Sequence, residues 1–214
     1  MKTATFYPKT HLFPHHPQIL HQMVLQLFLF TDGQGDNFPT ENMPHAMVMP
    51  YGSYFDTGAV QATGYRYRLG FHKPKHVVVI AFADLPEEMT LLGSNYQELH
   101  TFFGALPAAQ SAYKKLGVTI DNSLFAQHAD PIICQLPFLR SYQKIESITP
   151  LIINTQKTDH DRKKVWSALR DKTGATCYVL CTNLIDNSIA ALTQGYQSIT
   201  SEEFLMFDPK RKTS

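Results

Sequence analysis

The chain has little cysteine and little charge. Its three cysteines, Cys134, Cys177 and Cys181, form no CxxC pair. An odd, dispersed set of this kind argues against a disulfide-stapled fold and predicts a reducing compartment, so we expect a cytoplasmic protein. The net charge is +1, which gives no indication of a nucleic-acid partner or of attraction to an acidic membrane surface.

Long hydrophobic runs are absent as well. The most apolar early stretch, residues 19–30, is interrupted by one histidine and two glutamines and is too short to span a bilayer. Residues 1–8 lack the apolar core of a signal peptide. We therefore expect a soluble protein that enters no membrane.

The residues that are present fit one globular domain. The chain has 214 residues, of which 43% are apolar, and this is enough to bury one sizeable core. No repeat or linker divides it, so we interpret residues 1–207 as a single α/β domain. Residues 208–214 form a basic tail around Lys210, Arg211 and Lys212, which we interpret as a solvated terminus.

The apolar patterning predicts an α/β sheet. Short apolar, often β-branched runs predict buried strands, and apolar residues at helical spacing predict helices. The predicted strands cover residues 46–49, 77–83, 148–153 and 175–181, and the predicted helices cover residues 17–30, 58–68, 106–116, 134–144 and 159–171. Strands separated by helices indicate a three-layer α/β sandwich with a mixed, mostly parallel central sheet.

This organisation also predicts where a ligand binds. In open α/β sheets, ligands collect beyond the carboxyl ends of the strands. The segments that follow the three clearest strands are residues 50–54, 84–85 and 182–186. We expect the functional site to lie there.

Six segments of the chain resemble the motifs of one protein family. They are Phe6-Tyr7-Pro8; Pro50-Tyr51-Gly52-Ser53-Tyr54 with Gly58, Ala62 and Tyr65; Val77 to Asp84; Gln135-Leu136-Pro137-Phe138-Leu139; Pro150-Leu151-Ile152-Ile153; and Tyr178 to Asp186. In order and spacing they are similar to the motifs of the Memo family, also called AmmeMemoRadiSam system protein B, whose fold is related to the class III extradiol dioxygenases. The family continues through a further cysteine and a last core strand, so the resemblance implies a sheet shortened at its C-terminus.

The resemblance also implies that the family's metal ligands are replaced. Tyr51, Asp84, Asp130 and Asp186 stand where the family motifs have histidines, and Asn183 stands where they have an aspartate. The late cysteine ligand has no counterpart. Imidazole and thiolate suit iron, copper or zinc, so their loss removes a site for these metals.

We therefore expect a divergent Memo-like protein without the ancestral metal-dependent activity, acting as a binding or scaffolding module that needs no cofactor. The residues expected to contact its ligand are Tyr51, Ser53, Tyr54, Asp130 and Asn183. The partner would be another protein or a small ligand. Loss of a core strand would also expose a sheet edge or an apolar patch, which a homodimer would cover.

Two alternatives stay open. In the first, Asp84, Asp130 and Asp186 converge as hard oxygen ligands for a divalent cation such as Mg or Mn, which would support metal-assisted hydrolysis or ion binding. Aspartate is also common in turns and at helix N-caps, where it needs no metal. In the second, a pocket without metal is built from Tyr51, Ser53, Tyr54 and Asn183.

The cysteines and the lone tryptophan are interpreted as structural. Cys134 lies at the apolar start of a predicted helix, where a thiol is usually inert. Cys177 and Cys181 lie four residues apart in a predicted strand, so they point to one face and pack in the core. Trp166 shares a helical face with Val165 and Leu169 and is interpreted as a core residue.

Overall fold

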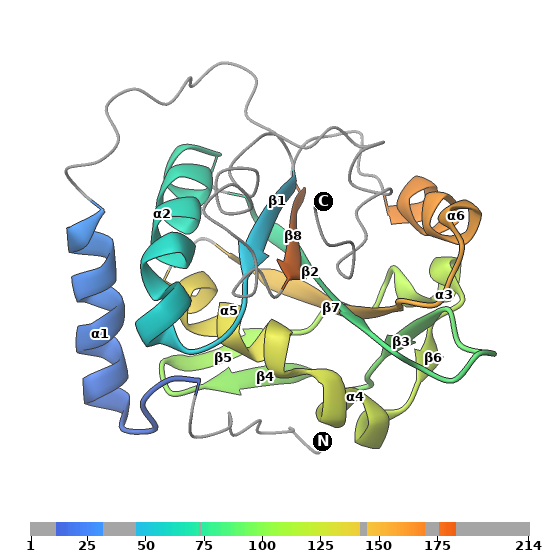
Figure 1. Ribbon diagram of the computed structural model, residues 1–214, viewed down its shortest axis with the longest axis horizontal. Coiled ribbons are helices and arrows are strands. Elements are labelled where there is room, and N and C mark those ends of the chain that lie inside the picture. The colour runs from blue at the N-terminus through green and yellow to red at the C-terminus, as the bar shows by residue number, and fades with distance from the viewer. Residues whose placement is uncertain (1–11, 32–45, 73, 142–144, 170–175, 183–214) are drawn as a thin grey trace, which may run out of the picture.

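A central six-stranded sheet organises the protein (Figure 1). The computed structural model describes residues 12–31, 46–72, 74–141, 145–169 and 176–182. The strands follow the order β1-β8-β2-β7-β3-β6 across the sheet. Their bounds are β1 Ala46–Pro50, β8 Thr176–Thr182, β2 His76–Ala83, β7 Ser147–Asn154, β3 Leu91–Gly93 and β6 Thr119–Ile120.

Most neighbouring strands run parallel. β8 pairs in parallel with both β1 and β2, and β2 pairs in parallel with β7. β3 runs antiparallel to β7, and β6 runs parallel to β3. The prediction of a mixed, mostly parallel sheet is therefore confirmed.

The central strands are buried on both faces, as their continuous apolar sequences predict. In β2, Val77 and Val79 belong to one buried cluster, whereas Val78 and Ile80 belong to the other. This alternation follows from the two-residue period of a strand. The sheet thus separates two hydrophobic cores.

Helices cover both faces and complete the three layers (Figure 1). The larger core contains residues from α1, α2, α4, α5 and a two-stranded hairpin, and the smaller core contains residues from α3 and α6. The bounds are α1 Pro17–Phe30, α2 Tyr54–His72, α3 Tyr113–Leu116, α4 Asn122–His128, α5 Asp130–Ser141 and α6 Asp159–Leu169. No helix in these parts of the chain is long and apolar enough to cross a membrane.

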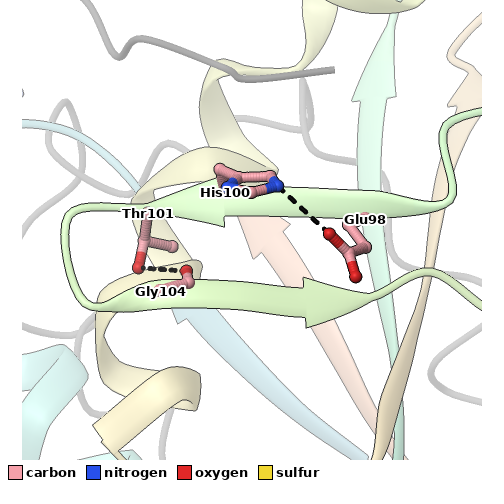
Figure 2. Close-up of polar contacts among 4 residues, drawn as sticks. All are labelled: Glu98, His100, Thr101 and Gly104. Carbon is pink, nitrogen blue, oxygen red and sulfur yellow. Dashed lines mark hydrogen bonds and ion pairs between the residues drawn. The ribbon is translucent and has the colours of Figure 1, made fainter. Parts of the chain in front are cut away.

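The prediction of a helix over residues 106–116 is wrong for most of its length. β5 (Gly104–Pro107) instead pairs with β4 (Glu98–Thr101) in an antiparallel hairpin, and only Tyr113–Leu116 is helical. Figure 2 shows the turn of the hairpin, where the Thr101 hydroxyl donates to the carbonyl of Gly104 at 3.0 Å. Gly104 has a φ of 113°, which L-residues with a side chain rarely adopt. The local turn therefore prevails over the helical apolar spacing.

Helix α2 begins earlier than predicted because residue 53 caps it. The carbonyl of Ser53 accepts from the Thr57 N–H at 2.9 Å, and the hydroxyl oxygen of Ser53 accepts from the Phe55 N–H at 3.2 Å.

Two glycines inside the helix are accounted for by packing. A Cβ on Gly58 would lie 2.7 Å from Leu27, and one on Gly64 would lie 2.8 Å from the sulfur of Met49.

The residues interpreted as core are confirmed as buried. Trp166 is 8% exposed and packs edge-on against Tyr178, with ring centroids 4.9 Å apart. The three cysteines are all buried, and Cys177 and Cys181 belong to the same core cluster. The expected role of these residues in packing agrees with their positions.

Candidate functional site

The loops that follow the parallel strands meet at one edge of the sheet. Pro50 at the end of β1 pairs with Thr182 at the end of β8, and the N–H of Tyr51 donates to the Thr182 carbonyl at 3.0 Å. At the end of β2, Ala83 pairs with Asn154 of β7. Residues 50–54 and 84–85 therefore lie at the carboxyl edge, as predicted. Asn183 and Asp186 lie outside the residues that the structure describes.

Tyr51 follows directly after β1 at this edge. It is half-buried, and it lies close enough to Cys181, Cys134 and Asp130 to interact with them electrostatically. Burial raises the pKa of the Tyr51 phenol, and the neighbouring Cys181, Cys134 and Asp130 raise it further. The phenol is therefore protonated at neutral pH and can both donate and accept a hydrogen bond.

Asp130 joins Tyr51 from a distant part of the chain. It is the first residue of α5 and is partly buried. The structure thus brings together two of the predicted site residues, one from the loop after β1 and one from the start of α5. We call Tyr51, Asp130 and Cys134 the carboxyl-edge site.

Cys134 contributes a neutral thiol to this site. Its sulfur donates to the carbonyl of Gly52 at 3.7 Å. Burial raises the pKa of the Cys134 thiol to about 12, against a smaller lowering by the Gly52 contact. The reactive form of a cysteine is the thiolate, so Cys134 is a poor nucleophile at neutral pH, in line with the expectation from the sequence.

A buried hydrogen-bond network fixes α5 to the loop after β1. The side-chain amide of Gln135 donates to the Pro50 carbonyl at 3.1 Å, and its oxygen accepts from the Tyr65 hydroxyl at 2.9 Å. Gln135 is fully buried. The sequence interpretation gave Gln135 no role, although a glutamine within the apolar run of residues 131–139 is a recognisable signal of a buried polar contact.

Tyr54 belongs to the core rather than to the open edge. It is 1% exposed, and its ring packs against Phe13 and Phe138. Its hydroxyl donates to the carbonyl of Cys134 at 2.6 Å. Tyr54 therefore supports the backbone beneath the site, and its hydroxyl is occupied inside the protein. Ser53 is partly buried and caps α2 as described above.

Asp84 lies apart from Tyr51 along the same edge. β8 separates β1 from β2, and two strand spacings amount to about 10 Å. The Asp84 side chain is exposed, and its carboxylate accepts from the Thr155 hydroxyl. Within the described ranges, no group of three His, Cys, Asp or Glu side chains is arranged to hold a metal ion.

Asn154 is a second residue that the sequence interpretation missed. It is fully buried, and its amide nitrogen donates towards the carbonyls of Leu85, Pro86 and Met89 at 3.1, 3.1 and 2.8 Å. Its side-chain oxygen accepts from the Leu85 N–H at 3.3 Å. Asn154 therefore sets the course of the loop after β2. The only sequence signal is an asparagine that closes the apolar strand of residues 147–154.

Comparisons with known proteins assign no family to the chain. No protein-family model matches it, and no curated protein sequence matches it. The class that fold and site define is a three-layer α/β protein with polar side chains at the carboxyl edge of its sheet.

Proposed function

We propose that this chain is a Memo-like binding module without metal-dependent activity, which holds a small polar ligand at the carboxyl-edge site. The observation that carries the proposal is that the Tyr51 phenol, at the end of β1, lies near enough to Asp130, from a distant segment of the chain, to interact with it electrostatically. Carboxyl ends of parallel strands are the usual ligand sites of this architecture.

The chemistry of the site favours a ligand that offers hydrogen-bond donors. A carboxylate has about four lone-pair positions, so Asp130 can accept from a ligand hydroxyl or amine besides its contacts within the protein. The protonated Tyr51 phenol can donate to an oxygen of the same ligand. Small polyols and amino alcohols have this combination of groups, and we propose them as the ligand class.

The nature of the other side chains supports binding over catalysis. The Cys134 thiol is held protonated by burial, with its pKa raised to about 12. The hydroxyl of Tyr54 is bonded to a backbone carbonyl. Tyr51 stands where the resemblance places a histidine ligand, and a phenol is no substitute for imidazole on a borderline-soft metal.

Thermal-shift measurements on the full chain test this proposal. The probes are a panel of small polyols and amino alcohols, with magnesium, manganese, calcium and zinc in parallel. We expect at least one organic probe to stabilise the protein, because a ligand that binds only the folded state raises its melting temperature. In Tyr51→Phe the affinity for that probe should fall about tenfold, which corresponds to about 1.4 kcal/mol.

Tyr96→Phe is the matched control, because Tyr96 is also partly buried but bonds to the carbonyl of Asn122, at the start of α4. Its affinity for the probe should equal that of the unchanged chain. Equal binding by Tyr51→Phe would refute the proposal. Stabilisation by magnesium or manganese that disappears in Asp84→Ala and Asp186→Ala would support the aspartate ion site in its place.

A further inference from the structure

Helix α1 presents an apolar face to solvent. Ile19, Leu25, Leu29 and Phe30 are 54%, 47%, 60% and 65% exposed, whereas Leu20 and Val24 on the inner side are buried in the core. In Figure 1, α1 lies at the periphery of the molecule with α2 beside it. Single exposed apolar residues are normal on a protein surface, but four on one helix form a patch that indicates an interaction site.

The exposed face of α1 carries no formal charge. The fourteen residues Pro17–Phe30 include no Asp, Glu, Lys or Arg. Besides the apolar residues, the exposed positions of α1 are Pro17, Gln18, His21, Gln22 and Gln26. Glutamine offers both a donor and an acceptor, so two facing glutamine amides can bond to each other.

The spacing of this face is symmetric along the helix. Ile19, Gln22, Gln26 and Leu29 follow one another at intervals of three, four and three residues, which is the spacing of the contact seam in paired helices. If a second α1 lies antiparallel about a two-fold axis at the level of Val24, Ile19 meets the partner's Leu29 and Gln22 meets the partner's Gln26. The apolar residues then meet at both ends and the amides meet at the centre.

We propose that the outer face of α1 (Ile19, Gln22, Gln26 and Leu29 as its seam) binds a second copy of this chain, helix to antiparallel helix. An isologous interface brings a surface against itself, so any charge on it would face a like charge. An uncharged face avoids this repulsion, and it offers no charged group by which a different partner would be selected.

Two features of α1 favour this partner over a membrane and set the strength of the dimer. Helices that lie on membranes usually have lysine or arginine on the polar face, and α1 has neither.

The length of α1 limits the area that the dimer can bury. Its fourteen residues extend about 21 Å. One helix face of this length is smaller than the area of about 800 Å² per partner in a standard interface. The dimer is therefore weak and forms reversibly as the concentration rises.

Sedimentation velocity of the full chain across a concentration series tests the proposal. We expect a reversible monomer–dimer equilibrium. Ile19→Lys and Leu29→Glu should each raise the dissociation constant at least about tenfold, because each places a charge against an apolar side chain of the partner. The double variant Ile19→Lys/Leu29→Glu should dimerise again, since each introduced lysine then lies opposite an introduced glutamate, and its association should weaken with salt.

Ile120→Lys is the matched control. Ile120 is 45% exposed on β6, so this variant adds the same charge elsewhere and should associate like the unchanged chain. The substituted side chains are all exposed, and unchanged melting temperatures will show that the fold is kept. A chain that stays monomeric at every concentration, or a double variant that fails to recover dimerisation, would overturn the proposal. So would flotation of the unchanged chain with phosphatidylcholine vesicles that is lost in Ile19→Lys.

Discussion

At the scale of single residues, Gln135 connects the carboxyl-edge site to the core. Its amide bonds to the Pro50 carbonyl and to the Tyr65 hydroxyl, and all three groups are buried. The Gln135 amide therefore pairs two groups that no water reaches, the Pro50 carbonyl as an acceptor and the Tyr65 hydroxyl as a donor. The geometry of the loop after β1, and hence of Tyr51, depends on this side chain.

We predict that Gln135→Leu lowers the free energy of unfolding by about 3 kcal/mol, because it leaves two buried polar groups without partners. Urea denaturation measures the change. In Gln135→Leu/Tyr65→Phe one of the unpaired groups is removed, so the loss should be smaller than the sum of the two single losses. The exposed control Gln156→Leu should change stability by less than about 0.5 kcal/mol. A loss as small as the control's would contradict the network.

Residues such as Gln135 and Asn154 show what the sequence could not predict. Their partners lie 85 and 69 positions away, and a contact of that kind exists only once the sheet has formed. Tyr51 and Asp130 are predicted to be at the site because the resemblance places family histidines at their positions. That Tyr54 is buried beneath it, three residues from Tyr51, depends on packing against Phe13 and Phe138.

At the scale of elements, helix α2 leads away from the site, and Ser53 caps its N-terminus. The serine oxygen accepts from the Phe55 N–H and so satisfies one of the backbone donors that a helix start leaves unpaired. The sequence interpretation assigned Ser53 to ligand binding. The cap gives this residue a structural role that can be measured separately.

We predict that Ser53→Ala lowers the free energy of unfolding by about 1 kcal/mol, the usual effect of losing an N-cap. Ser53→Asn keeps a capping oxygen and should restore most of this stability. Chemical denaturation of the three proteins provides the measurement. If Ser53→Asn is as unstable as Ser53→Ala, the side chain has another role.

Long, buried elements are predicted from the sequence more accurately than short, partly exposed ones. β2 is predicted almost to the residue because seven of its eight positions, residues 77–83, are a continuous apolar run between polar ends. The β4–β5 hairpin was missed because each strand has four residues and only one fully buried side chain, Leu99 or Leu106. Short strands of this kind are specified by pairing and by the turn at Gly104, which periodicity does not reveal.

At the scale of the whole molecule, the protonated groups of the larger core determine how stability responds to alkali. Burial raises the pKa of Cys134 to about 12 and raises those of Cys181, Tyr54 and Tyr65 well above their ordinary values. In the unfolded chain the two cysteines lose their protons around pH 8.5 and the two tyrosines around pH 10. The folded state keeps the protons, so the stability that they contribute is fully present below about pH 8 and is lost progressively as the pH rises further.

We therefore predict that the free energy of unfolding is nearly steady from pH 7 to about pH 8. It then falls, approaching about 1.4 kcal/mol per pH unit for each of the two cysteines, and the two tyrosines steepen the fall from about pH 10. Urea midpoints measured from pH 7 to pH 10.5 provide the test. Cys134→Ala removes one of these groups. Its free energy of unfolding should therefore fall less steeply with pH than that of the unchanged chain, by up to about 1.4 kcal/mol per pH unit. A flat profile up to pH 10.5 would show that these thiols and phenols are open to solvent.

The order of the strands has a consequence for synthesis on the ribosome. β8 lies between β1 and β2, although its residues follow those of β2 by about a hundred positions. Because a chain emerges from its N-terminus onwards, β1 and β2 are made early and then remain without their common neighbour. The main-chain groups along those edges stay unpaired until residues 176–182 arrive, so a stalled or shortened nascent chain is prone to aggregation.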